Sequence, residues 1–172
     1  MNHDAYADVY IRGILRDYKR FAMVGASPNT VRPSYFAMKY LIGKGFRVIP
    51  VNPGHAGKQL LGETIYASLA DIPEAVEVVD IFRNSDAALD ITRQAIEIGA
   101  KVVWMQLGVR NDEAARLAEE AGIKVVMNRC PKIEYGRLSG EIGWAGVNTG
   151  MLSSQRLVLG RQGFQKLSIR KD

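Results

Sequence analysis

The sequence predicts an α/β fold in which a parallel sheet of about five strands is doubly wound, with helices on both faces. Short apolar runs bounded by Gly and Pro recur along the chain, and stretches with helical periodicity separate them. Such runs are typical of strands buried on both faces, as in a parallel sheet covered by helices. The first run, residues 21–24, leads into a small-residue turn and a helix, the arrangement of a phosphate-binding unit. We therefore expect the functional site at the carboxyl end of this strand.

The chain begins with an amphipathic stretch. Apolar residues at three- and four-residue spacing predict a helix over residues 4–18. The first strand follows at 21–24. A second helix is expected from Ser34, as its N-cap, to about Lys44, where flanking glycines end it.

The second strand ends at a strong turn signal. We expect it at residues 46–51, closed by Asn52-Pro53-Gly54. The residues that follow, 55–71, are too few for a further strand–helix unit. They predict a long connection with a local turn or two.

The second half of the chain repeats the strand–helix pattern. Further strands are expected at residues 76–82, 101–106 and 124–127. The intervening helices are expected from Ser85 or Asp86 to Ile98 and from Asn111 or Asp112 to Ala121. This alternation predicts right-handed crossovers and the strand order 3-2-1-4-5, with strands numbered along the chain.

The length of 172 residues calls for one domain, which we expect over residues 1–150. After Cys130-Pro131, recurrent glycines are expected to break any long element, so that this tail wraps the sheet edge or a partner subunit. Residues 151–172 are expected to form a partly disordered C-terminal extension.

Composition narrows the cellular setting. The hydrophobic fraction of 47% and charged fraction of 24% are ordinary for a soluble globular protein, and no apolar run approaches the roughly 20 residues needed to span a bilayer. The N-terminal residues include Asp4 and Asp8 and lack an apolar core segment, so a signal peptide is not expected. A single cysteine permits no internal disulfide, so a reducing cytoplasm is the expected compartment.

Charge favours anionic partners. The net charge is +5 and the pI is about 9.4. Nucleic-acid binding is disfavoured because the basic residues are scattered, without the clusters and interleaved aromatics of nucleic-acid readers. A phosphorylated cofactor suits the charge better.

The candidate binding residues follow the five predicted strands. In a sheet of the expected order, ligands bind where the order reverses, between the carboxyl ends of strands 1 and 4. The residues are Gly25, Ala26, Ser27, Arg32, Pro33 and Ser34 after the first strand, Asn52, Pro53 and Lys58 after the second, Phe82 and Arg83 after the third, Gln106, Leu107 and Gly108 after the fourth, and Cys130, Pro131 and Lys132 after the fifth. Among these loops, the possible charge partners for phosphate are Arg32, Lys58, Arg83, Arg110 and Lys132, although any single one is more often a solvated surface cation.

The ligand is not expected to be NAD. Only Gly25 matches the glycine-rich dinucleotide fingerprint, and Asn52 stands where a carboxylate usually holds a ribose hydroxyl of NAD. A phosphorylated adenosine, as in NADP or coenzyme A, fits this charge better, and Lys58 is a candidate for contacting its phosphate.

No catalytic constellation or metal-ligand spacing is visible around His3 or His55. Cys130 is expected to face the cleft. The alternative is that Cys130 is a structural residue, packed under the turn that follows the fifth strand.

Four ordered segments together resemble the small stand-alone CoA-binding proteins, whose fold is that of the N-terminal domain of the succinyl-CoA synthetase α subunit. The segments are Gly25-Ala26-Ser27 leading to Arg32-Pro33-Ser34-Tyr35, Val48 to Pro53, Val103 to Gly108, and Arg129 to Lys132. The resemblance covers about residues 21–138. It implies a Rossmann-like domain that binds coenzyme A at the point where the strand order reverses.

The resemblance also implies roles for the loops. Gly25 to Ser27, with Asn52, Pro53 and Lys58, would meet the phosphates and adenosine, while Gln106 to Gly108 and Cys130-Pro131 would line the cleft. The synthetase carries its phosphorylated histidine in a second domain that this sequence lacks, so ligase activity is not expected. The sequence thus predicts a non-catalytic CoA carrier, sensor or regulatory module, possible as a homo-oligomer or with a partner enzyme. The alternative is an NADP- or acyl-CoA-dependent enzyme component completed by a partner chain.

Overall fold

The computed structural model describes residues 1–140, so the predicted domain boundary at residue 150 and the extension 151–172 lie outside the described residues. The helices are α1 (Asp8–Asp17), α2 (Pro33–Gly43), α3 (Ala88–Glu97), α4 (Asp112–Glu120) and α5 (Pro131–Leu138), with short 3-10 turns η1 (Pro53–His55) and η2 (Leu69–Asp71). The strands are β1 (Arg20–Val24), β2 (Arg47–Val51), β3 (Gln59–Leu60), β4 (Glu63–Thr64), β5 (Val78–Ile81), β6 (Val102–Met105) and β7 (Lys124–Val126). None of the helices between residues 1 and 140 has both the length and the apolar character that crossing a membrane requires.

Five parallel strands form the central sheet in the order β2-β1-β5-β6-β7. The predicted α/β class with a parallel sheet is confirmed, but the predicted order 3-2-1-4-5 is wrong. Counted along the sheet strands alone, the observed order is 2-1-3-4-5, because β5 pairs with β1 and not with β2. The strand order therefore reverses between β1 and β5 rather than between the first and fourth strands.

The outer edge of β2 is already occupied, which explains this order. Tyr66 forms a parallel bridge with Val51, and its backbone N–H donates to the Pro50 carbonyl at 3.0 Å. Pro50 also has no N–H to donate, so it suits an edge strand and not the centre of a sheet. The connection after β2, which contains the antiparallel pair β3 and β4, thus covers the edge where the third strand was expected.

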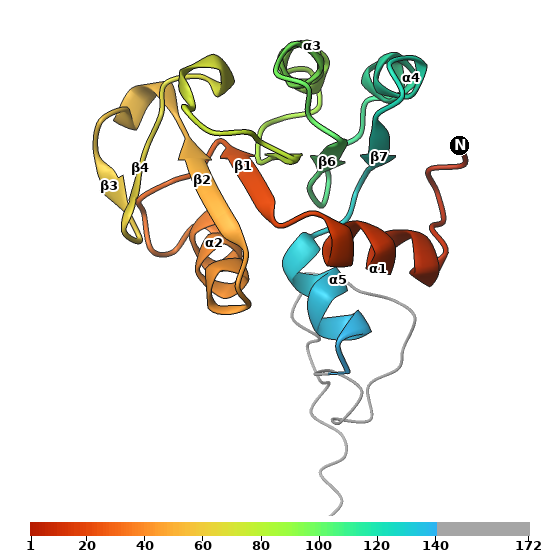
Figure 1. The fold of residues 1–172 in the computed structure, drawn as a ribbon, viewed down its shortest axis with the longest axis horizontal. Coiled ribbons are helices and arrows are strands. Elements are labelled where there is room, and N and C mark those ends of the chain that lie inside the picture. Colours follow the sequence, from red (N-terminus) through yellow and green to blue (C-terminus); the bar gives the residue numbers. More distant parts are fainter. Residues whose placement is uncertain (141–172) are drawn as a thin grey trace, which may run out of the picture.

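Helices cover both faces of the sheet (Figure 1). One face carries α3 and α4, and the other carries α1, α2 and α5. The core on the first face includes Ile91 and Ala118, and that on the second includes Leu15, Met38 and Leu41. The helix α5 was not predicted, because glycines after Cys130 were expected to break any long element; instead, Gly136 lies buried within the helix.

The N-terminal segment closes the exposed edge of β7. The Met127 N–H donates to the Tyr6 hydroxyl at 2.7 Å, and the Val125 N–H donates to the Tyr10 hydroxyl at 3.2 Å. These backbone groups face away from β6, where an edge strand otherwise leaves its donors unpaired. Two tyrosines from the start of the chain therefore hold α1 against the end of the sheet, beside the carboxyl end of β7.

Candidate functional site

A cleft of about 930 Å³ opens where the strand order reverses. For the order 2-1-3-4-5 this point lies between β1 and β5, the place where open α/β sheets bind ligands. The volume falls in the range of small-molecule and cofactor sites, roughly 300–1,000 Å³. The reversal of strand order therefore lies one strand away from its predicted position, while the cleft still lies at the carboxyl end of β1.

Most of the predicted residues line this cleft. They are Gly25, Ser27, Arg32, Pro33, Ser34, Asn52, Phe82, Arg83, Gln106, Leu107, Cys130 and Lys132. The predicted residues that are not among its walls are Ala26, Pro53, Lys58, Gly108 and Pro131. Sequence reasoning did not single out five apolar wall residues, which are Val31, Phe36, Ala37, Val109 and Ile133. Phe36 is 49% exposed, which is unusual for a large apolar side chain. The sequence alone does not show that this side chain is exposed.

The loop after β1 is held by backbone contacts. Gly25 has φ +93°, and its N–H donates to the Val51 carbonyl at 2.9 Å. A Cβ atom at this position would lie 2.4 Å from the carbonyl oxygen of Phe82. Gly25 is therefore required for the turn to pack against the end of β5.

Ser34 has a different role from the predicted one. The N-cap of α2 is Arg32, with Pro33 at the first helical position, so the prediction of Ser34 as N-cap is wrong. Proline is favoured at this position because its missing N–H would be unpaired in any case. The Ser34 hydroxyl is buried and accepts a hydrogen bond from the Ser27 N–H at 3.1 Å. It fixes the loop after β1 over the first turn of α2, whose N-cap has no side-chain hydrogen bond.

Asn52 connects two of the loops. Its amide Nδ2 donates to the Ala26 carbonyl at 2.8 Å, while its Oδ1 accepts from the Gly54 N–H at 3.0 Å. A carboxylate here would lack the donor that Ala26 requires. The hydrogen bond to Ala26 thus gives a structural reason for an amide side chain, and not a carboxylate, at the end of β2.

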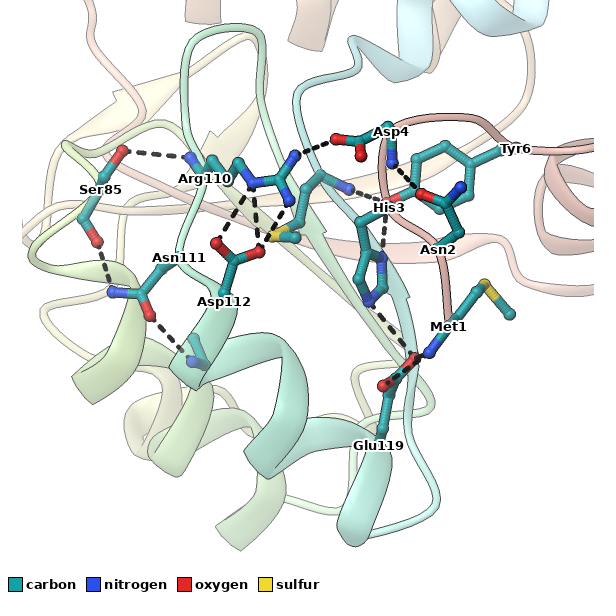
Figure 2. Close-up of polar contacts among 12 residues, drawn as sticks. Met1, Asn2, His3, Asp4, Tyr6, Ser85, Arg110, Asn111, Asp112 and Glu119 are labelled. Carbon is teal, nitrogen blue, oxygen red and sulfur yellow. Dashed lines mark hydrogen bonds and ion pairs between the residues drawn. The ribbon is translucent and has the colours of Figure 1, made fainter.

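The predicted cations separate into two groups. Arg32, Arg83 and Lys132 line the cleft. Arg110 is not among the cleft walls, and its guanidinium pairs with Asp4 and Asp112, as Figure 2 shows. Lys58 is exposed on the loop that precedes β3. Its contact with a ligand phosphate stays a prediction.

A buried carboxyl lies beneath the cleft. Asp80, in the central strand β5, is 0% exposed, and Gln106 Nε2 donates to its two oxygens at 2.9 and 3.1 Å. Burial raises the pKa of Asp80 to about 8, and the hydrogen bond from Gln106 opposes that rise. Sequence reasoning missed Asp80, although a carboxylate within an apolar parallel strand is the signal that points to it.

Cys130 lies at the carboxyl end of the sheet, as N-cap of α5, and is partly buried among the cleft walls. Burial raises the pKa of its thiol, hydrogen bonds from the Ile133 and Lys132 backbone oppose this, and the nearby Asp80 adds to the rise. The thiol form of Cys130 therefore dominates at neutral pH.

Comparison with known proteins identifies the family. Residues 19–136 match the family described as CoA binding domain. This chain belongs to that family. The CoA-binding domain spans every sheet strand and all the loops that line the cleft.

Two small proteins and part of a larger one are similar to this chain. A Bacillus subtilis (strain 168) protein, "Uncharacterized protein YneT", is 34% identical over 125 residues, which cover 73% of this chain and 91% of the relative. A solved structure of a "hypothetical protein from Pyrococcus horikoshii OT3" is 44% identical with a TM-score of 0.76, covering 81% of this chain and 97% of that one. An acetyl-coenzyme A synthetase 1 from Ca. Korarchaeum cryptofilum, 24% identical with a TM-score of 0.58 over 67% of this chain and 27% of its own, shares the fold.

Proposed function

We propose that this protein binds coenzyme A in the cleft between β1 and β5, as a non-catalytic carrier, sensor or regulatory component of CoA-linked metabolism in the cytoplasm. The observation that carries the proposal is the cleft itself: the first turn of α2 and three cations, Arg32, Arg83 and Lys132, meet at one hollow. Helix N-termini and cations both favour phosphate. The family match to a CoA-binding domain supports the same ligand.

The residues suggest an orientation for coenzyme A. Its phosphates would lie at the start of α2 with the loop Gly25 to Ser27, and its pantetheine arm would run along Phe82 and Leu107. The thiol end would then approach Cys130. In this orientation the cleft would supply binding groups for the phosphates and the pantetheine arm.

Titration calorimetry with coenzyme A tests the proposal. We expect a 1:1 complex, and we expect the double variant Arg32→Ala/Lys132→Ala to bind at least tenfold more weakly. A charge-assisted hydrogen bond contributes roughly 1.5–3 kcal/mol, and solvent exposure of Arg32 reduces its share. Arg93→Ala, which removes one exposed charge from α3 far from the cleft walls, is the control and should leave the affinity unchanged.

The same titrations address the alternatives. Equal affinity of the parent and the double variant would contradict this placement of coenzyme A. Tighter binding of NADP than of coenzyme A would favour the enzyme-component alternative. A loss in Lys58→Ala as large as in the double variant would support the predicted contact of Lys58 with a phosphate.

Cys130 provides a separate expected result. Its thiolate is expected to attack the disulfide of oxidised coenzyme A slowly, forming a mixed disulfide and releasing one coenzyme A thiolate, because burial raises the thiol pKa. Raising the pH should accelerate the reaction. Intact-protein mass spectrometry should show the adduct in the parent and none in Cys130→Ser, while Cys130→Ser binds reduced coenzyme A nearly normally. An adduct that persists in Cys130→Ser, or a parent that reacts only after unfolding, would contradict this placement of the thiol.

A further inference from the structure

A second cavity adjoins the cleft at Cys130. Its volume is about 310 Å³, and it shares three wall residues with the cleft: Leu107, Cys130 and Ile133. These three side chains are all partly exposed and stand between the two hollows. If coenzyme A lies in the cleft as proposed, its thiol end lies next to the wall that the cleft shares with this second cavity.

The walls of this cavity are of two kinds. One side is apolar and comes from Ala5, Ile11, Leu107 and Ile133. The other side carries two guanidinium groups, Arg129 and Arg137, around the carboxylate of Glu134. We call this cavity the acyl chamber, defined by these seven residues with Tyr6, Asp8 and Cys130.

The buried carboxylate binds the two arginines unequally. Glu134 is 3% exposed, and it accepts hydrogen bonds from Arg137 Nη2 at 2.7 Å and Nε at 3.1 Å. The Arg129 Nε lies 3.7 Å from Glu134 Oε1, which is an ion pair but too long for a hydrogen bond. Arg129 also lies 5.6 Å from the Tyr6 ring centroid. Its Nη1 donates to the Asn128 carbonyl at 2.9 Å and its Nη2 to the Asp4 carbonyl at 3.4 Å. Among the described residues, backbone carbonyls and not a bidentate carboxylate therefore orient this guanidinium group.

Asp8, an exposed residue, balances the positive charge of the acyl chamber. Two arginines and the buried Glu134 leave one positive charge, which Asp8 neutralises through a 2.7 Å ion pair with Arg137 Nη1. Asp8 has a side chain 56% exposed, and exposed ion pairs contribute only about 0–1 kcal/mol. A ligand carboxylate can therefore replace Asp8 at small cost and gain a charge-assisted bond to arginine.

We propose that the acyl chamber takes the acyl group of a CoA thioester and selects a short chain that ends in a carboxylate over a neutral chain of equal length. The apolar wall suits methylene groups, and the arginine pair suits the terminal carboxylate. The volume corresponds to roughly ten waters at liquid density, which accommodates a few carbons but not a long fatty chain. The inference rests on the proposed function, since the thioester must lie in the cleft.

Calorimetry with three ligands tests it: coenzyme A, glutaryl-CoA and valeryl-CoA, the last two having acyl chains of five carbons with and without a terminal carboxylate. We expect glutaryl-CoA to bind about tenfold more tightly than valeryl-CoA. Arg129→Gln should reduce this preference, because it removes one of the two positive charges of the chamber. Asp8→Asn should increase it, because the internal competitor for Arg137 is gone. Arg137 itself is left intact, since its loss would leave the buried Glu134 without its closest partner.

The outcomes separate the two proposals. If coenzyme A itself does not bind, the proposed function fails and the chamber with it. If coenzyme A binds but glutaryl-CoA and valeryl-CoA bind equally, or Asp8→Asn lowers the preference, the acyl chamber is wrong and the proposed function stands. Circular dichroism and an unchanged affinity of both variants for coenzyme A show that folding and the cleft are intact.

Discussion

Replacing Gly25 with alanine is expected to destabilise the protein by about 2–5 kcal/mol. A non-glycine residue at the φ of +93° costs roughly 1–2 kcal/mol, and the new Cβ would lie 2.4 Å from the backbone oxygen of Phe82. Forcing an atom into a packed region adds typically 1–3 kcal/mol. Urea unfolding of the purified variant measures the loss.

The matched control is Gly99→Ala. Gly99 also has a positive φ, +72°, but nothing lies within 4 Å of its Cβ position. Its variant should show the conformational strain alone, so the difference between the two variants isolates the collision with Phe82. Equal destabilisation would show that the loop after β1 relaxes freely.

Replacing Asp80 with asparagine is expected to stabilise the protein by several kcal/mol at pH 8 and by little near pH 4. Burial raises the pKa of Asp80 to about 8, compared with about 4 in an unfolded chain. Between these values the folded state binds more protons than the unfolded state, so the stability of the parent falls as the pH rises. At about 1.4 kcal/mol per pKa unit, the upper limit is near 5 kcal/mol. Asparagine keeps the shape and, through its amide oxygen, one of the two contacts with Gln106 Nε2, without the charge.

Urea unfolding at several pH values between 4 and 8 measures this effect. The stability gap between Asp80→Asn and the parent should widen steadily with pH. Asp86→Asn, at an exposed aspartate that follows β5, controls for the loss of one negative charge. A gap that stays constant with pH would show that Asp80 remains ionised throughout, and a less stable Asp80→Asn at pH 8 would show that its carboxylate is required in the fold.

Local patterns were sufficient for the secondary structure of the sheet. The runs around Phe21 to Val24 and Val102 to Met105 are apolar because both faces of these strands are buried. Such a run can be recognised in the sequence without knowing which strands pair with it. Helix signals were equally local. Asn111 caps α4 by accepting from the Ala114 N–H at 2.9 Å, as its residue type predicts.

The candidate site was predicted in part for a related reason. Parallel strands bring their carboxyl ends to one edge, so the loops after them meet whatever the strand order. Gly25, Arg32 and Lys132 therefore line one cleft even though the predicted order was wrong. Arg110 follows the same rule of position, yet it pairs with Asp4 from the start of the chain, a contact that no local pattern reveals.

By itself the sequence determined the α/β class, the alternation of strands and helices, and the loops among which a ligand site must lie, because burial and turn formation act on neighbouring residues. Only the tertiary structure decided the pairing of β5 with β1, the use of Ser34 to hold Ser27, and the second cavity beside Cys130. These features depend on residues far apart in the chain. Tyr66 covers the edge of β2, and Asp8 pairs with Arg137. These contacts stabilise the protein only when the sheet is assembled, because the sheet brings the two partners together.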